Sequence, residues 1–223
     1  MVNVACVYRT GGDFDRRWVH ALKRGLNRTN PGHRFFCLSD DPGIEWYHRV
    51  KLKYPLPGWW SKLELFRPGA LPEGEPVVYV DLDTLPVGDL GEIASYTGPL
   101  AMLSDFYAAR RDPRSAPAQS GVMVFTPGDY TRSLWEAFFA RHREHVRKFR
   151  GDGEWLNAHT KPDRLQDLFP GQIVSFKVHA TKGPPRGARL VCGHGKPRFS
   201  DPAAGWAHQA WASLYDPELP WVS

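Results

Sequence analysis

The sequence predicts an α/β fold in which helices cover both faces of a mainly parallel central sheet. Buried strands are indicated by the apolar runs "NVACVY" (3–8), "RFFCLS" (34–39) and "VVYVDLD" (77–83). Between the first two runs, residues 14–28 carry apolar side chains at a helical period. Strands that alternate with helices in this way are typical of parallel sheets, whose ligands bind beyond the carboxyl ends of the strands.

The remaining segments extend the same pattern. Residues 46–54 predict a short strand or extended segment, and residues 61–67 predict a helix start with Ser61 and Glu64 as a capping box. Further strands are expected at 100–106, 121–127, 172–181 and 188–197, a long amphipathic helix at 129–149 and another helix from 151. We expect residues 1–223 to form a single domain, in which 200–223 are a loop-rich C-terminal tail.

The composition restricts the class of protein. The chain has 223 residues, of which 42% are hydrophobic, enough to bury a full core. No stretch approaches the ~20 apolar residues of a membrane span. The first residues, "MVNVACVYRT", lack the features of a signal peptide, so we expect a cytoplasmic protein. The three cysteines are widely spaced and form no CxxC pair, which indicates core residues rather than a zinc site.

The formal charge of +5 includes a basic stretch at 141–150. Such a stretch is most simply a solvated helix face, and otherwise a surface for an anionic acceptor or a peripheral membrane contact. The sequence contains no motif of a nucleic-acid-binding protein, and we expect no nucleic-acid partner.

Asp81 and Asp83 end the run "VVYVDLD". Residues two apart on an extended chain point the same way, so the two carboxylates can address one site. Their hard oxygens suit Mg²⁺ or Mn²⁺ held against a substrate phosphate. Alternatively, the first aspartate attacks phosphate as a nucleophile. A structural interpretation, in which both residues serve as turn formers or helix caps, also remains open.

The segment "VVYVDLDTLPVGDL" resembles the DxD segment of GT-A glycosyltransferases of family 8, which includes glycogenin and bacterial lipopolysaccharide glycosyltransferases. "WSKLELF", "QSGVMVF" and "HGKPRF" are similar to three other family segments and occur in the same order. The resemblance extends from about residue 2 to 200. It implies a GT-A type, Rossmann-like α/β/α sandwich and a metal-dependent, retaining sugar transfer from a nucleotide-sugar, usually UDP-linked.

The resemblance also implies a set of metal and phosphate ligands. Asp83 would bind Mn²⁺ (or Mg²⁺) directly, Asp81 would bind the metal or the ribose, and His194 would be the third protein ligand. Lys62 and Lys196 would contact the donor phosphates, as point charges suited to them. Gly195 would let the backbone approach the ligand closely.

Other matches concern the donor and are implied in the same way. The base and ribose contacts would fall at Tyr8 and Arg9, and the donor sugar would be lined by Asp105, Gln119, Ser120, Gly121 and Asp152. Asp152 and Lys62 are the candidates for a direct part in the reaction. Gln119 replaces the usual Asn, and Gly153 stands where a Gln is frequent, so that Glu154 is a candidate replacement for the missing polar group.

Two alternatives remain. The Asp pair also fits a haloacid-dehalogenase-like, Mg²⁺-dependent phosphatase with Asp81 as nucleophile, although about 80 residues precede a motif that usually opens that domain. A homologue that binds nucleotide-sugar without transferring it is permitted by Gln119 and Gly153. The acceptor, a saccharide, a lipid-linked group or a protein, is not identified. The aromatic tail with Trp206, Trp211 and Trp221, or the loop 107–119, is expected to bind it.

Overall fold

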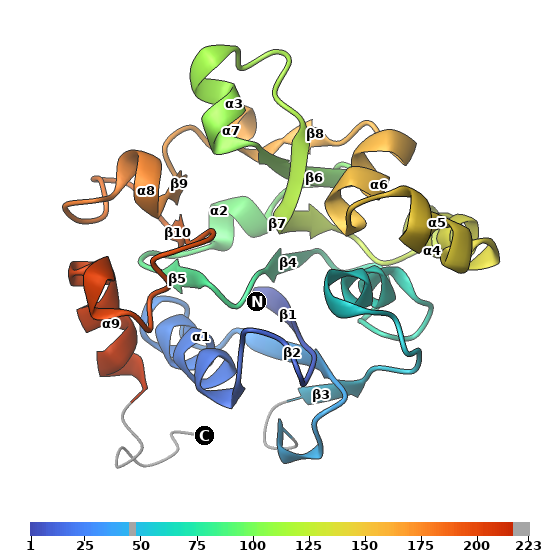
Figure 1. Ribbon diagram of the computed structural model, residues 1–223, viewed down its shortest axis with the longest axis horizontal. Coiled ribbons are helices and arrows are strands. Elements are labelled where there is room, and N and C mark those ends of the chain that lie inside the picture. Colours follow the sequence, from blue (N-terminus) through green and yellow to red (C-terminus); the bar gives the residue numbers. More distant parts are fainter. Residues whose placement is uncertain (45–47, 216–223) are drawn as a thin grey trace.

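The computed structural model describes residues 1–44 and 48–215 and has the predicted α/β architecture (Figure 1). A seven-stranded sheet has the order β3-β2-β1-β4-β7-β6-β8. Its strands are β1 (Asn3–Tyr8), β2 (Arg34–Ser39), β3 (His48–Lys51), β4 (Val77–Val80), β6 (Leu100–Ser104), β7 (Ala118–Phe125) and β8 (Asp163–Arg164). Neighbouring strands are parallel except at β7, which runs antiparallel to both β4 and β6. The sheet is therefore mainly parallel, as predicted.

A smaller sheet has the order β5-β10-β9, formed by β5 (Thr84–Pro86), β10 (Leu190–Cys192) and β9 (Ile173–Ser175). Because β5 directly follows the Asp pair, this sheet brings a distant part of the chain to it. The backbone N–H of Gly193, after β10, donates to the carbonyl of Asp83 at 2.6 Å. The segment around "HGKP" is thereby placed beside residue 83.

Helices cover both faces of the large sheet, and each face has its own apolar core. One core includes α1 (Arg16–Thr29), α9 (Trp206–Leu214) and the small sheet, and the other includes η2 (Gly58–Phe66), α4 (Asp129–Ala140) and α6 (Asp152–His159). Successive residues of β4 alternate between them: Val78 and Val80 belong to the first core, Val77 and Tyr79 to the second. The remaining helices are η1 (Pro42–Ile44), α2 (Gly91–Ala94), α3 (Phe106–Arg111), α5 (His142–Lys148), α7 (Leu165–Leu168), α8 (Phe176–His179) and η3 (Pro202–Ala204).

The capping box predicted at Ser61 and Glu64 is wrong. These residues lie inside the 3-10 helix η2, which begins at Gly58 after Pro57. The Ser61 hydroxyl donates to the carbonyl of Leu56 at 3.1 Å. The buried Glu64 carboxylate accepts from the backbone N–H groups of Lys53 and Tyr54, at 2.8 and 3.0 Å. The two side chains thus fasten η2 to the chain before it, a role that local spacing does not indicate.

Three other segments differ from their predicted form. The long helix expected at 129–149 is interrupted at Arg141, whose φ of −132° leaves the helical range, and so forms α4 and α5. In the strand expected at 172–181, only Ile173–Ser175 is extended, because Ser175 caps the short helix α8. The tail expected to be loop-rich contains η3 and α9, whose residues Ala207, Trp211 and Leu214 are buried. Trp46, Tyr47 and Trp221 lie outside the described residues.

Within the described part of the chain, no helix combines the length and the apolar character that crossing a membrane requires.

Candidate active site

A cavity of about 1040 Å³ opens at the carboxyl ends of β1 and β4. Distant segments contribute to its wall, among them the end of β1, η2, the turn after β4, the start of β7, α6 and the loop after β10. The start of β7 lies there because this strand is antiparallel to β4, and the Asp81 N–H donates to the Gly121 carbonyl at 2.8 Å. The wall includes most of the predicted site residues: Tyr8, Arg9, Lys62, Asp81, Asp83, Asp105, Gln119, Ser120, Gly121, Asp152, Glu154, His194 and Gly195.

Lys62 is the cation at the centre of this wall. Its Nζ lies 2.8 Å from Asp81 Oδ1 and 3.9 Å from Asp152 Oδ2. The Tyr79 hydroxyl also donates to Asp81. Burial disfavours the charge on Lys62, yet Asp152 and Asp81 together raise its pKa above the usual value. Lys62 is therefore a fixed ammonium that links the carboxylate after β4 to the one that begins α6.

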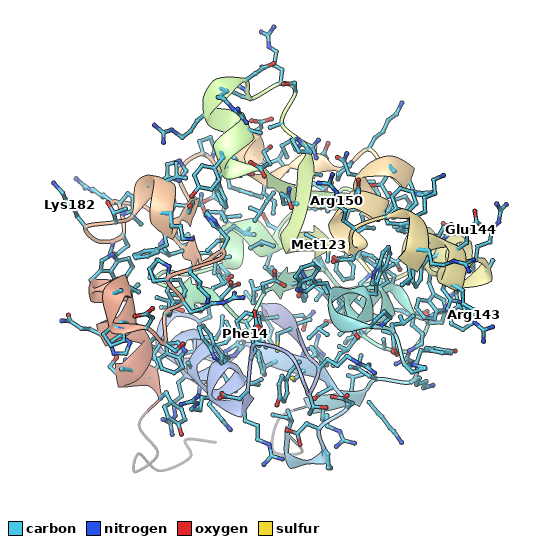
Figure 2. All side chains as sticks on the ribbon, in the orientation of Figure 1. Phe14, Met123, Arg143, Glu144, Arg150 and Lys182 are labelled. Atoms are coloured by element: carbon cyan, nitrogen blue, oxygen red, sulfur yellow. The ribbon has the colours of Figure 1, made fainter. Side chains whose placement is uncertain are left out.

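Asp83 is bound by an arginine that the sequence analysis did not identify. Arg198 Nη1 lies 3.0 Å from Asp83 Oδ2, while Arg198 Nη2 lies 2.8 Å from Asp13 Oδ2. The guanidinium also lies 4.7 Å from the ring centroid of Phe14, which is labelled in Figure 2. Burial and the neighbouring Asp81 raise the pKa of Asp83 to about 7. The one sequence signal was that Arg198 lies within the matched segment "HGKPRF".

His194 has a local partner in this structure, and Lys196 lies outside the described cavity wall. His194 Nε2 lies 2.6 Å from the Ser175 hydroxyl, and its ring packs against Phe106 and Tyr107. Across residues 1–44 and 48–215, no group of three His, Cys, Asp or Glu side chains is arranged to hold a metal ion. His194 thus lines the same cavity as the Asp pair without forming a three-ligand cluster with it among the described residues. Lys196 is exposed and is absent from the described cavity wall, whereas Gly195 and Arg198 belong to it.

The two aspartates nevertheless fit a divalent cation. The described cavity wall carries more acidic than basic side chains: Asp13, Asp81, Asp83, Asp105, Asp152 and Glu154 against Arg9, Lys62, Arg150 and Arg198. An anionic ligand would be repelled by this surplus unless it brought a cation with it. Carboxylate oxygens are the ligands that Mg²⁺ and Mn²⁺ prefer, and Mg²⁺ often takes its remaining ligands from water and substrate phosphates. Asp81 and Asp83 are therefore the residues that would hold such an ion.

Asp152 is the first residue of α6 and is 3% exposed. None of the described residues hydrogen-bonds its Oδ2 atom, which lies in the cavity wall. Burial raises the pKa of this carboxyl, and Lys62 opposes the effect. A buried oxygen without a hydrogen bond is costly, and the Lys62 ammonium 3.9 Å away is the charge that offsets this cost.

The other predicted donor residues have local partners as well. Asp105 caps α3 through the N–H groups of Tyr107 and Ala108, and its second oxygen accepts from Gln119 Nε2 at 3.2 Å. Glu154 accepts the Arg150 N–H at 2.6 Å. The longer amide of Gln119 therefore reaches Asp105, which joins two residues that were predicted separately.

Tyr8 and Arg9 lie at the end of β1, at another part of the wall. Tyr8 is buried, and burial raises the pKa of its hydroxyl. Arg9 Nη1 lies 3.3 Å from the Tyr54 carbonyl and 3.4 Å from Ser61 Oγ. These contacts hold Arg9 against η2, so its guanidinium is positioned before any ligand binds.

The fold is that of known glycosyltransferases. The galactosyltransferase LgtC, solved in complex with donor and acceptor sugar analogues, matches with a TM-score of 0.69 at 12% identity over 98% of both chains. GlyE, a glycosyltransferase of Streptococcus pneumoniae, matches with a TM-score of 0.69 at 14% identity over 96% of this chain and 63% of its own. The bifunctional glycosyltransferase WbbM matches with a TM-score of 0.65 at 12% identity over 99% of this chain and half of its own. No family model and no curated protein matches the sequence. These likenesses establish the GT-A fold, and the chain spans less than two thirds of GlyE and WbbM.

Proposed function

We propose that the chain is a glycosyltransferase that moves a sugar from a nucleotide-sugar, with UDP as the nucleotide, to a saccharide, lipid-linked or protein acceptor. The observation that carries the proposal is the position of the Asp81–Lys62–Asp152 cluster. It lies in a large cavity at the strand ends of a fold shared with glycosyltransferases. We further propose that residues 1–223 act as one donor-binding domain.

The charges of the cavity support a division of roles. In this proposal Asp81 and Asp83 hold Mn²⁺ or Mg²⁺, which would stabilise negative charge on a departing nucleoside diphosphate. Lys62 and Arg198 supply fixed positive charge beside the same carboxylates. They limit the repulsion between the acidic wall and the phosphates. Arg198 takes the part that the sequence had indicated for Lys196.

The uncharged part of the donor has its own candidates. The Asp152 carboxylate would accept a hydrogen bond from a hydroxyl of the transferred sugar, and the linked Gln119 and Asp105 would contact others. Tyr8 would stack on the base, with Arg9 beside the ribose. We propose transfer with retention of configuration and assign no protein nucleophile.

Thermal unfolding in the presence of nucleotides tests the proposal. We expect the Tm to rise with UDP or a UDP-sugar only when Mn²⁺ or Mg²⁺ is present, because a ligand that binds only the folded state stabilises it. Incubation of the best UDP-sugar with acceptor mixtures should then release UDP. A rise in Tm with GDP instead of UDP would leave the proposed sugar transfer unchanged and would replace the UDP-linked donor by a GDP-linked one.

Two results would count against it. Binding of UDP-sugar without release of UDP for any acceptor would indicate a binding protein that does not transfer. Absence of any nucleotide response, together with Mg²⁺-dependent hydrolysis of p-nitrophenyl phosphate that Asp81→Asn abolishes, would favour the phosphatase.

A further inference from the structure

Trp59 is a large apolar side chain that the fold leaves in solvent. It is 68% exposed and belongs to the cavity wall. The next residue, Trp60, is 5% exposed and stacks on Phe138 at 5.6 Å between ring centroids. Trp60 thus anchors η2 to α4, and this rigid attachment presents Trp59 at the cavity.

The position of Trp59 relates it to the centre of the site. In a 3-10 helix, side chains three residues apart lie above one another, so Trp59 and Lys62 share one face of η2. Lys62 in turn contacts Asp81 and Asp152. A Cβ atom on Gly151 would lie 3.4 Å from Trp59 Cε3, so the indole also lies against the residue that precedes Asp152. Trp59 therefore lies where η2 meets the start of α6.

A second observation concerns the polarity of this corner. Asp152 belongs to the same wall; among the described residues its buried Oδ2 atom accepts no hydrogen bond, and Lys62 Nζ lies 3.9 Å from it. The charged side chains of Arg150 and Glu154 belong to this wall as well. An exposed aromatic ring in a wall with charged, hydrogen-bonding side chains fits a ligand with an apolar face and hydroxyl groups. A pyranose ring has both, since its axial C–H bonds form one face and its hydroxyls surround the edge.

We propose that Trp59 is the platform on which the pyranose ring of a saccharide acceptor stacks. This inference rests on the proposed function and narrows the acceptor to a carbohydrate. The reacting hydroxyl must approach the sugar held at Asp152, and the Trp59 ring is an exposed aromatic surface against Gly151, the residue before Asp152. Its exposure lets an acceptor enter from solvent, whereas Asp152 itself is buried.

The test compares wild type, Trp59→Ala, Trp59→Phe and the matched control Tyr130→Ala. Tyr130 is an aromatic on α4 that is 37% exposed and outside the cavity wall. The probes are the methyl α- and β-glycosides of glucose, galactose and mannose, together with maltose, cellobiose and lactose. Saturation-transfer difference NMR titrations are recorded with and without UDP and Mn²⁺, and calorimetry measures UDP affinity separately.

We expect wild type and Tyr130→Ala to bind at least one of these saccharides with equal affinity. Trp59→Ala should weaken that binding by about tenfold or more, and Trp59→Phe by less, because a smaller ring keeps part of the stacking surface. The affinity for UDP, which has no sugar to transfer, should change by less than about twofold in Trp59→Ala.

The proposal is overturned if wild type binds none of the saccharides, or if Trp59→Ala binds them as wild type does. It is also overturned if Trp59→Ala instead loses binding to vesicles of phosphatidylcholine and phosphatidylglycerol, which would make Trp59 a membrane contact. If the proposed function fails, the result is different: wild type shows no response to UDP. The saccharide titrations recorded without UDP then still decide the role of Trp59.

Discussion

Arg198 binds Asp83, with Nη1 3.0 Å from Oδ2, and the other end of its guanidinium binds Asp13. Asp83 belongs to the turn after β4, and Arg198 to the loop after β10, so the pair joins two segments 115 residues apart. A divalent ion that binds Asp83 would approach the same carboxylate. We therefore expect Arg198 and the ion to compete in the free protein and to act on the same phosphates once a donor is bound.

Arg198→Ala should separate these two effects. Loss of the guanidinium frees Asp83, so Mn²⁺ alone should bind more tightly, whereas UDP in saturating Mn²⁺ should bind about tenfold more weakly. Electron paramagnetic resonance of free Mn²⁺ and calorimetry with UDP measure the two affinities. Arg34→Gln, which alters a remote ion pair with Glu75, is the control. An unchanged UDP affinity would remove Arg198 from the phosphate site.

Asp83→Ala and His194→Ala test the ligand set. Asp83→Ala should abolish Mn²⁺-dependent UDP binding and leave the fold intact, because the buried carboxyl has few protein partners to lose. His194→Ala should leave the Mn²⁺ affinity within about twofold, because the imidazole contacts Ser175 rather than the aspartates. Calorimetry and circular dichroism provide the readouts. A large loss of Mn²⁺ affinity in His194→Ala would restore the histidine as a third ligand.

Lys62→Met should destabilise the fold as well as impair donor binding. The change leaves Asp81 and the buried Asp152 without their shared cation, a loss that commonly costs about 3 kcal/mol. Adding Asp152→Asn should recover part of the free energy of unfolding, because the buried negative charge is then removed. Urea denaturation of the single and double variants measures this coupling. If the two losses simply add, the Lys62–Asp152 contact does not contribute to stability.

The lowered pKa of His20 predicts that the folded protein loses stability in mild acid. Burial, followed by Arg24 and Arg16, lowers the pKa of this histidine from 6.5 to about 4. The folded state therefore favours the neutral ring, and its stabilising contribution is complete above pH 6.5 and is lost as the pH falls from 6.5 toward 4. We expect the free energy of unfolding to fall by ~1–2 kcal/mol over this range, because some solvent still reaches the ring.

Urea denaturation between pH 8 and pH 4 tests this assignment. The free energy of unfolding of His20→Gln should fall less steeply between pH 6.5 and pH 4 than that of wild type. The difference between the two proteins at pH 8 serves as the reference, since the ring is neutral there in both states. Parallel curves for the two proteins would assign the acid sensitivity to other groups.

The central part of the site could be predicted from the sequence because a local sequence feature determines its position. Asp81 and Asp83 end an apolar strand, and strand ends in parallel sheets carry ligand sites, so the alternation alone placed both carboxylates at the cavity. The strands β1, β2 and β4 and the helix α1 could also be predicted, since apolar periodicity determines them. The matched segments "WSKLELF" and "QSGVMVF" indicated Lys62 and Ser120 as site residues, and both lie in the cavity wall.

Features that depend on distant packing could not be predicted in this way. The histidine of "HGKP" matched a family motif, yet the small sheet places its ring against Ser175 and puts Arg198 at Asp83. Gly153 was seen as a lost glutamine, whereas the structure shows that a Cβ there would lie 3.2 Å from Ser120 Oγ. Close approach of α6 to β7 therefore leaves little room for a side chain at this position. Ser61 and Glu64 had the spacing of a cap but bind residues outside their helix.

The antiparallel course of β7 also bears on how substrate preference could evolve. The loop between α3 and β7 enters the strand at the cavity, and its residue Pro117 belongs to the wall. The register of β7 with β4 is set farther along, by pairs from Val80↔Val122 to Val77↔Phe125. Insertions or deletions before residue 117 would therefore reshape the entrance without shifting these pairs. For the proposed glycosyltransferase function, grafting this loop between proteins of this fold is a route to new acceptors on an unchanged donor site.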